Sequence, residues 1–303
     1  MRYAVTGAAG FIGSHLADAL AAAGHDVVGI DCFTDAYDRM LKEENASGLD
    51  VLRLDLAQDD IDLSAFDGVF HLAGQPGVRS FGDVFPLYVR NNVLASQRLF
   101  EAAAAAGVRV VFSSSSSIYG AAERFPTPEG TTPEPISPYA ITKLAAEHLG
   151  RAYARSFGLD LVVVRYFNAF GPRQRPDMAF TRMVFALAEG RPFELYGDGR
   201  QTRGWTYVGD VVSATVAAME RGSGTYNVGG GVEASMRESI ALLERISGRT
   251  LEVVEGPAVP GDQRRTRADT TRIREELGWT PAVSLEDGLS AQWEWAAARV
   301  AAR

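Results

Sequence analysis

Residues 3–23 read YAVTGAAGFIGSHLADALAAA, in which an apolar run leads into a glycine-containing turn and then into an alanine- and leucine-rich segment. The turn carries Gly7, Gly10 and Gly13. Glycine lets a backbone turn sharply, approach a pyrophosphate closely and bring a helix against a strand. The phosphates are then held at the N-terminus of the following helix. The stretch therefore predicts a strand, a phosphate-binding turn and a helix, which together form a dinucleotide-binding unit.

Asp31 follows this unit at the end of the second expected strand. A carboxylate at that position hydrogen-bonds the adenosine ribose hydroxyls and repels a 2′-phosphate. Because no arginine directly follows Asp31, the sequence favours NAD over NADP as the cofactor. Asp55 ends the third expected strand and is expected to reach the adenine edge. Ala73 and Gly74 end the fourth and are expected to leave space for the cofactor.

Short apolar runs alternate with helical patterns through the first half of the chain. Strands that are apolar on both faces and separated by helices indicate a parallel sheet that is covered on both sides. The expected fold is α/β, a doubly wound, Rossmann-like parallel sheet with a smaller C-terminal substrate-binding α/β lobe. The expected strands are residues 3–6, 27–31, 51–54, 68–73, 109–113 and 161–166, and the expected helical segments are residues 15–23, 93–106 and 139–157.

The amino-acid composition changes after residue 167, where Gly, Pro and Arg become more frequent. We therefore expect an NAD-binding domain at residues 1–167 and a substrate-binding lobe at residues 168–303. Segments around residues 205–230 are apolar enough that we expect them to pack back on the first sheet.

The composition excludes several classes of protein. The 303 residues are 46% hydrophobic and carry a net charge of −8, which argues against a general nucleic-acid or anionic-membrane surface. No apolar run is long enough to span a membrane. The single cysteine, Cys32, cannot form an internal disulfide, so a reducing cytoplasm is expected. The four histidines and one cysteine show no metal-ligand spacing, so no metal site is expected.

A tyrosine and a lysine four residues apart indicate a catalytic helix. Ser137 is expected to cap this helix and Pro138 to begin it, which places Tyr139 and Lys143 on one face. A tyrosine must have its pKa lowered from about 10 to act as a base near neutrality. The Lys143 ammonium, the positive helix end and a nicotinium ring would all favour the phenolate. Ser115 lies near the end of the fifth expected strand. It is placed to hydrogen-bond the substrate hydroxyl from which Tyr139 would take a proton.

These segments carry a resemblance to a known family. Together they resemble the extended short-chain dehydrogenase/reductase family, specifically its NAD-dependent nucleotide-sugar epimerase and dehydratase branch, and are most similar to UDP-glucuronate 4-epimerases. The likeness covers nearly the whole chain. Its motifs are TGAAGFIGSHL at residues 6–16, NNV at 91–93, SSSSSIYG at 113–120, SPYAITK at 137–143, GWTYVGDVV at 204–212 and GDQRRTRADTTRIREELGWTP at 261–281.

The resemblance implies roles for individual residues. Ser115, Tyr139 and Lys143 would be the catalytic residues. The expected contacts to NAD are Gly7, Gly10, Phe11, Ile12, Gly13, Asp31, Asp55, Leu56, Leu72, Ala73, Gly74, Asn91, Ser113, Tyr139, Lys143, Tyr166 and Phe167. The expected contacts to a UDP-sugar are Ser115, Ser116, Ser117, Tyr139, Asn168, Arg175, Arg203, Asp262 and Arg264.

One position departs from the pattern of this branch. Many members have an arginine before the Pro-Gly-Asp step, whereas this chain has Val259. A contact to the diphosphate in this region is therefore expected from Arg264 or Arg265.

Ser116 and Ser117 distinguish among the reactions of the branch, which share an initial oxidation of the sugar at C4. Members that eliminate water across C5 and C6 resemble one another in having an Asp-Glu pair here, and uronate decarboxylases usually have a Glu. Neither serine hydroxyl can abstract a C5 proton at neutral pH. Simple epimerisation remains: Tyr139 takes the 4-hydroxyl proton, the C4 hydride passes to NAD, the ketone turns over, and the hydride returns to its other face.

The segment GPRQRPDMAF at residues 171–180 is expected to bind the substrate. Its two prolines restrict the loop that presents Arg173 and Arg175, which suits capture of an anion by a two-pronged contact. The segment resembles that of epimerases acting on UDP-glucuronate, in which Arg175 with the Ser116 and Ser117 hydroxyls would bind the C5 carboxylate. The 4-keto intermediate is a β-keto acid, which loses carbon dioxide when the carboxyl bond aligns with the ketone π system. The carboxylate must therefore be held near the ring plane.

Alternatives remain open at this stage. In one alternative, Arg173 and Arg175 only bind phosphate or lie on the surface. Asn168 also occurs at this step in epimerases for neutral sugars. The alternatives are a UDP-glucose or UDP-N-acetylhexosamine 4-epimerase, a UDP-glucuronate decarboxylase, and a non-catalytic NAD-binding sensor, of which the last is disfavoured by the presence of Tyr139 and Lys143. The homodimer usual in this branch would form through residues 93–106 and 139–157.

Overall fold

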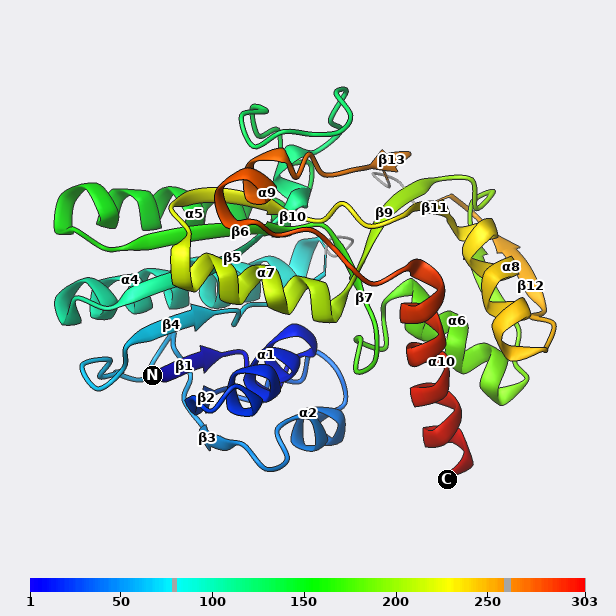
Figure 1. Ribbon diagram of the computed structural model, residues 1–303, viewed down its shortest axis with the longest axis horizontal. Coiled ribbons are helices and arrows are strands. Elements are labelled where there is room, and N and C mark those ends of the chain that lie inside the picture. The colour runs from blue at the N-terminus through cyan, green and yellow to red at the C-terminus, as the bar shows by residue number, and fades with distance from the viewer. Residues whose placement is uncertain (78–80, 259–262, 303) are drawn as a thin grey trace.

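A seven-stranded parallel sheet lies at the centre of the protein (Figure 1). The computed structural model describes residues 1–77, 81–258 and 263–302. The strand order β10-β6-β5-β4-β1-β2-β3 changes direction at β1, and every neighbouring pair is parallel. This confirms the expected doubly wound α/β fold. The strands are β1 (Arg2–Thr6), β2 (Asp26–Ile30), β3 (Asp50–Leu52), β4 (Gly68–His71), β5 (Arg109–Ser115), β6 (Leu161–Tyr166) and β10 (Gly224–Val228).

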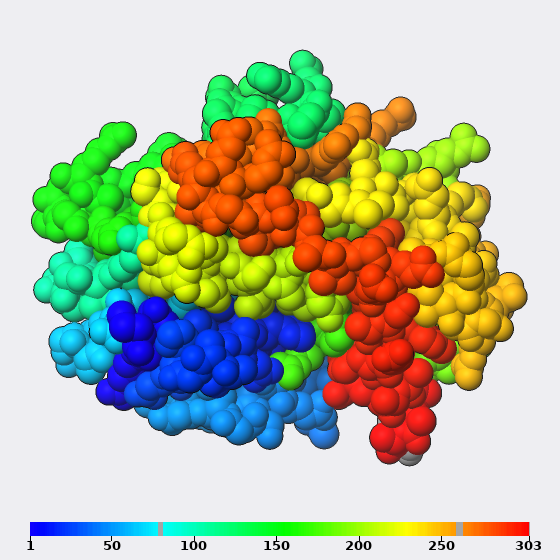
Figure 2. Space-filling view, viewed as in Figure 1, coloured from blue at the N-terminus to red at the C-terminus, as the bar shows by residue number. Residues whose placement is uncertain are grey.

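Helices cover both faces of this sheet, because its central strands carry apolar side chains on both sides. On one face α1 packs against α7, as the blue and yellow-green layers of Figure 2 show, and α9 packs against β10. On the other face α4 packs against α5. The helices are α1 (Phe11–Ala22), α4 (Ala95–Ala106), α5 (Pro138–Phe157), α7 (Val208–Arg221) and α9 (Thr271–Leu277).

Several element ends differ from the sequence-based expectation. β3 and β4 each end two residues early, because the chain turns out of the sheet: Leu54 N donates to Leu52 O, and Ala73 N donates to the Thr6 hydroxyl. β5 extends two residues further than expected, to Ser115. Short elements follow several strands: α2 (Arg39–Asn45), η1 (Gly82–Val84), α3 (Phe85–Tyr88) and η3 (Ser116–Tyr119).

The helix expected from residue 93 begins as the π-helix η2 (Val89–Leu94) and continues as α4. Asn92 lies in this wide turn and is 1% exposed. Its Oδ1 accepts a hydrogen bond from Gln75 N at 2.7 Å, and its Nδ2 donates to Thr142 Oγ1 at 3.1 Å. π turns inside helices often accompany functional sites. This one ties the segment after β4 to α5.

The C-terminal part of the chain has a core of its own, formed by Phe170, Phe180, Leu243 and Leu289 with their neighbours. β9 pairs with β7, β11 and β13, and β8 pairs with β12. We call this unit the second lobe. Its elements are β7 (Asn168–Phe170), α6 (Ala179–Glu189), β8 (Phe193–Tyr196), β9 (Thr202–Tyr207), β11 (Glu233–Ser235), α8 (Met236–Ser247), β12 (Val253–Gly256), β13 (Arg265–Thr266) and α10 (Leu285–Ala301).

The segment between β9 and β11 lies with the first sheet: α7 packs against α1, and β10 pairs with β6. The division of the chain into domains at residues 167 and 168 stays a prediction. In the described ranges, none of the helices combines the length and the apolar character that a membrane-spanning segment needs.

Glu147 and Arg165 form a buried ion pair between α5 and β6, with exposed fractions of 0% and 3%. Arg165 donates from Nε to Glu147 Oε1 at 3.0 Å and from Nη2 to Oε2 at 2.8 Å. Its Nη1 donates to Tyr119 Oη and to the Glu129 carbonyl. Burial alone would raise the pKa of Glu147, but the hydrogen bonds and charge of Arg165 hold that pKa below its ordinary value. The pair fixes α5 against the sheet.

We predict that Glu147→Gln lowers the free energy of unfolding by about 3–5 kcal/mol, because it leaves the buried Arg165 charge uncompensated. Denaturant unfolding followed by circular dichroism measures the change. Glu220→Gln is the matched control, since Glu220 pairs with Arg221 on the surface, where both side chains are about half exposed. The control should change stability by less than about 1 kcal/mol. Equal losses in both variants would contradict this account of the buried pair.

Candidate active site

A cavity of about 980 Å³ lies at the carboxyl ends of the sheet strands, between the sheet and the second lobe. Its walls include the turn after β1, the ends of β2, β4, β5 and β6, and the start of α5 on one side. β7, the loop before α6, β8 and β9 contribute the other side. Figure 1 shows the second lobe beside that edge of the sheet. Ligands of open α/β sheets bind at this edge, near the point where the strand order changes direction.

The turn after β1 leaves room for backbone and phosphate only. Gly7 has φ +69°, which favours glycine. A Cβ added at Gly13 would lie 2.1 Å from the Gly7 carbonyl oxygen, so the start of α1 can approach β1 only without a side chain there. Gly10 is the N-cap of α1, and no side chain caps the first amides of the helix. These amides fit a pyrophosphate, as expected for a dinucleotide site.

Asp31 lies directly after β2 and lines the cavity. Its Oδ2 accepts a hydrogen bond from Ala9 N at 3.1 Å, and its Oδ1 accepts one from Phe33 N at 2.8 Å. Each carboxylate oxygen has a second lone pair, which can accept a ribose hydroxyl. Asp31 therefore joins the glycine turn to the place where the adenosine ribose is expected.

The other expected cofactor contacts also line this cavity. Asp55 is engaged by Arg90, whose guanidinium donates to it. A Cβ added at Gly74 would lie 2.8 Å from Asn92 Oδ1, so glycine there makes room for the Asn92 side chain. The expected residues found in the lining are Gly7, Gly10, Phe11, Ile12, Gly13, Asp31, Asp55, Leu56, Leu72, Ala73, Gly74, Asn91, Ser113, Tyr139, Lys143, Tyr166 and Phe167.

The structure brings the three expected catalytic residues to one wall of the cavity. Ser137 caps α5 by accepting a hydrogen bond from Ala140 N at 3.2 Å, which fixes where the helix presents Tyr139 and Lys143. The Ser117 hydroxyl donates to Ser115 Oγ at 2.9 Å. A side-chain hydrogen bond joins Ser115 to Tyr139. The three hydroxyls thus form a continuous chain that ends at the tyrosine.

Burial and charge act on the pKa of Tyr139 in opposite directions. Burial raises the pKa of Tyr139, while the Arg175 guanidinium and the Ser115 hydrogen bond act to lower it. The expected influence of Lys143 on this pKa stays a prediction. The Lys143 Nζ lies 4.6 Å from the centre of the Phe112 ring. Burial lowers the pKa of Lys143 to about 8, against the opposing attraction of Glu147.

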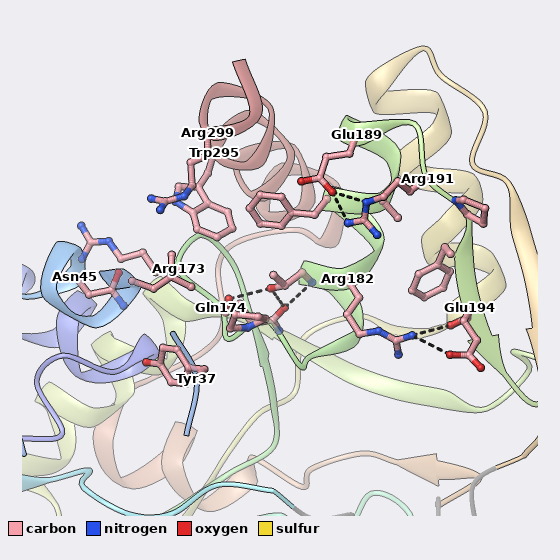
Figure 3. A pocket seen from close by; sticks show the side chains of 17 residues that line it. Tyr37, Asn45, Arg173, Gln174, Arg182, Glu189, Arg191, Glu194, Trp295 and Arg299 are labelled. Atoms are coloured by element: carbon pink, nitrogen blue, oxygen red, sulfur yellow. Dashed lines mark hydrogen bonds and ion pairs between the residues drawn. The ribbon is translucent and has the colours of Figure 1, made fainter. Parts of the chain in front are cut away.

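The loop before α6 is anchored by Gln174, which is 2% exposed. Its Nε2 donates to the Ala169 carbonyl at 2.9 Å, and its Oε1 accepts hydrogen bonds from Thr181 N and Gln292 Nε2. Figure 3 shows Gln174 with Arg173 and Arg182 around a second cavity of about 400 Å³. The anchored backbone presents Arg173 and Arg175 to different partners.

The two arginines form different ion pairs. Arg173 donates from Nη1 to Asp18 of α1 at 2.7 Å, and it lines the second cavity and not the larger one. Arg175 lines the larger cavity and pairs with Asp177 through two hydrogen bonds. Arg175 is therefore the arginine that reaches the cavity with the catalytic wall.

The remaining expected substrate contacts divide into three groups. Ser116, Ser117, Asn168 and Arg203 line the cavity with the residues above. Arg264 does not: its carbonyl accepts Thr202 N, and the residue is exposed outside the lining. Arg265, the other expected diphosphate contact, is paired with Glu233 at 2.6 and 2.8 Å. Asp262 and Val259 lie outside the described residues.

The cavity also contains residues that the sequence analysis did not single out. Tyr37 and Lys42 line it beside Asp31, and the buried Tyr37 hydroxyl has no hydrogen-bond partner in the described chain. The sequence feature that could have identified them is their position shortly after Asp31. Thr266 lines the opposite side and accepts a hydrogen bond from Asn168 Nδ2 at 2.6 Å, a contact set by the pairing of β13 with β9.

Comparison with known proteins agrees with this geometry. Residues 3–229 match the NAD dependent epimerase/dehydratase family. The fold is similar to that of UDP-glucuronic acid 4-epimerase from Bacillus cereus in complex with UDP-glucuronic acid and NAD, with a TM-score of 0.92, 40% identity, and 98% and 99% of the two chains covered.

Two curated relatives cover nearly the same span. UDP-glucose 4-epimerase of Mycolicibacterium smegmatis is 40% identical over 302 residues, with 96% of each chain covered. UDP-glucuronate 4-epimerase of Thermodesulfobacterium geofontis is 35% identical over 308 residues, with 97% of this chain and 95% of the relative covered. With a glycine cradle for a dinucleotide, a half-buried tyrosine and a buried lysine on one helix, and these matches, the chain belongs to the NAD-dependent epimerase/dehydratase family.

Proposed function

We propose that the protein is a UDP-glucuronate 4-epimerase, which interconverts UDP-glucuronate and UDP-galacturonate through a 4-keto sugar. The observation that carries this proposal is the presence of Tyr139, Ser115 and Arg175 on one cavity, with the Arg175 charge acting on Tyr139. The relatives from Bacillus cereus and Thermodesulfobacterium geofontis that are named for UDP-glucuronate support it.

NAD is the cofactor, and when bound it would supply reversible hydride transfer at C4 of the sugar. The protein's residues hold it: the α1 amides would bind its pyrophosphate, and Asp31 would bind its adenosine ribose. Tyr139 would take the proton of the sugar 4-hydroxyl and give it back after the ketone has turned over. Ser115 would hydrogen-bond the same sugar oxygen, with Ser117 donating to Ser115.

Ser116 and Ser117 favour epimerisation over elimination. Both lie in the short helix η3, directly after Ser115, and both line the cavity. Their hydroxyls can donate hydrogen bonds to a carboxylate, but they do not act as bases toward a C5 proton at neutral pH. Together with Arg175 they would hold the C5 carboxylate of a uronate.

A second candidate, a 4-epimerase for a neutral UDP-hexose, is favoured by one observation. Arg175 already has a carboxylate partner in Asp177, so a substrate carboxylate is not needed to neutralise it. The Mycolicibacterium smegmatis relative is named for UDP-glucose. The two candidates differ in what Arg175 contacts.

We further propose that the protein works as a homodimer in the cytoplasm, where NAD and UDP-sugars are available. Apolar side chains on α5 and next to α4 support the dimer: Leu94, Ile141 and Phe157 are 45%, 49% and 68% exposed. A contiguous exposed apolar patch marks an interaction site, and these three side chains would contribute to such a patch along the helix pair. Sedimentation velocity should give the mass of two chains.

Asp31→Ala should weaken NAD binding about ten- to a hundredfold, because it removes charge-assisted hydrogen bonds worth about 1.5–3 kcal/mol. The NAD content of the purified protein and NAD titration measure the loss. Asp26→Ala is the matched control, since Asp26 lies at the other end of β2 and pairs with Arg2 on the surface. If Asp31→Ala binds NAD as tightly as the wild type, the ribose contact is wrongly placed.

Tyr139→Phe should keep NAD binding and lower turnover about 10²- to 10⁴-fold, since only the transferable proton is lost. Steady-state turnover of UDP-glucuronate measures the effect. Tyr153→Phe serves as the control, because that hydroxyl contacts Gln97 between α4 and α5. Wild-type turnover in the Tyr139 variant would remove this residue from the role of base.

Arg175→Ala should raise KM for UDP-glucuronate about ten- to a hundredfold and KM for UDP-glucose little, because only the uronate carries the carboxylate. A loosened carboxylate should also release carbon dioxide and give UDP-pentose by-products. Arg173→Ala, which removes the neighbouring arginine from the second cavity, is the control. Equal weakening of both sugars by Arg175→Ala would assign this arginine to the diphosphate and favour the neutral-sugar epimerase.

A further inference from the structure

Asp177 occupies one edge of the Arg175 guanidinium. Arg175 Nε donates to Asp177 Oδ1 at 3.0 Å, and Arg175 Nη2 donates to Asp177 Oδ2 at 2.9 Å. A guanidinium has five N–H donors arranged in a planar fork. The Asp177 pair uses the Nε edge, so the Nη1–Nη2 edge keeps the geometry for a second two-pronged contact with a carboxylate.

The backbone on which this pair sits is fixed. Gln174 is buried and held by Ala169, Thr181 and Gln292, and Pro176 separates the two members of the pair. The long Arg175 side chain is therefore the movable part of the loop. Its direction is set by the contact with Asp177.

With Asp177 in place, the guanidinium acts on the catalytic centre. Arg175 and Asp177 both line the large cavity, as do Ser116 and Ser117. The Arg175 charge is the largest influence that lowers the pKa of Tyr139. Arg175 therefore shares the cavity with the catalytic residues while it is paired with Asp177.

We propose that Asp177 is a positioning residue for uronate selectivity, which holds the Nε edge of Arg175 so that the Nη1–Nη2 edge receives the C5 carboxylate. This inference rests on the proposed function and deepens it, because it names the residue that orients the carboxylate receptor. In this role Asp177 acts through Arg175 and needs no contact of its own with the sugar.

Asp177 has two opposing effects on a bound uronate. Its negative charge repels the substrate carboxylate, but its side chain is 60% exposed, so water and salt screen that repulsion. Its hydrogen bonds restrict the Arg175 rotamers before the substrate arrives, which removes an ordering cost from binding. The ordering effect is the larger one, so loss of Asp177 weakens uronate binding.

Orientation also controls a side reaction of the 4-keto uronate. When the carboxylate tilts out of the ring plane, the C5–C6 bond breaks, carbon dioxide leaves, and the electron pair stays on C5 as the enolate of the C4 ketone. A proton then adds at C5, and return of the hydride to C4 gives a UDP-pentose. An Arg175 that is free to rotate should therefore increase the share of UDP-pentose among the products.

The test compares Asp177→Asn with the wild type, both as full-length protein loaded with NAD. Calorimetric titration should show about tenfold weaker binding of UDP-glucuronate and less than twofold change for UDP-glucose, which lacks the carboxylate. Product analysis by NMR should show a larger UDP-pentose fraction from UDP-glucuronate. Asp177→Glu, which retains a carboxylate, should restore part of the affinity.

Asp18→Asn is the matched control. Asp18 pairs with Arg173 of the same loop, and the exposed fractions of that pair, 58% and 31%, are close to the 60% and 24% of Asp177 and Arg175. Asp18→Asn should leave both affinities and the product ratio unchanged. A merely structural role for Asp177 would affect both sugars alike.

Unchanged or tighter binding of UDP-glucuronate by Asp177→Asn would overturn the assignment, and so would equal weakening of both sugars. Failure of the proposed function would give a different result. The wild-type protein itself would not convert UDP-glucuronate, and this outcome overturns both proposals. If the wild-type protein converts UDP-glucuronate but Asp177→Asn leaves the ratio of the UDP-glucuronate and UDP-glucose affinities unchanged, only the Asp177 assignment is overturned.

Discussion

The common direction of the strands in the central sheet determines where everything else lies. Because all seven strands are parallel, their carboxyl ends meet at one edge. Gly7 follows β1 at that edge, Asp31 follows β2, and Ser115 ends β5. Residues more than a hundred positions apart in the sequence therefore form one wall of the cavity. The second lobe supplies the facing wall, and the cavity between the two walls has a volume of about 980 Å³.

Burial and charge then set the chemistry of that wall. At the cavity wall Tyr139 is half-buried and Lys143 is buried. Loss of solvent contact raises the pKa of the phenol and lowers the pKa of the ammonium to about 8. Arg175 opposes the first effect from the facing lobe. One guanidinium is thus linked to both the base and the proposed carboxylate site. The proposed reaction therefore depends on the sheet and the second lobe lining the same cavity.

The sequence was sufficient for features that depend on local geometry. Gly7, Gly10 and Gly13 predicted the turn because only glycine tolerates that backbone contact, and Ser137 with Pro138 predicted the start of α5 because capping is a local preference. Strand ends were less accurate, since the exit of β4 depends on a hydrogen bond between Ala73 and Thr6, which are distant in sequence.

Features that depend on tertiary contacts were not predicted. The anchoring of Gln174 by Gln292 and the place of Tyr37 beside the cavity follow from how distant segments pack. The role expected of Lys143 toward Tyr139 stays a prediction, because spacing places two residues on one helix face but does not fix where a long side chain ends. Arg264 was assigned by resemblance, and the pairing of its backbone with Thr202 leaves it outside the lining.

The most direct test of the account is the ratio of kcat/KM for UDP-glucuronate to that for UDP-glucose in the wild-type protein, with products identified by the NMR signals of their anomeric protons. The account predicts that UDP-glucuronate is the better substrate by at least about tenfold, the value of one hydrogen bond to a charged group, and that UDP-galacturonate is the product. Equal or preferred conversion of UDP-glucose to UDP-galactose would contradict it.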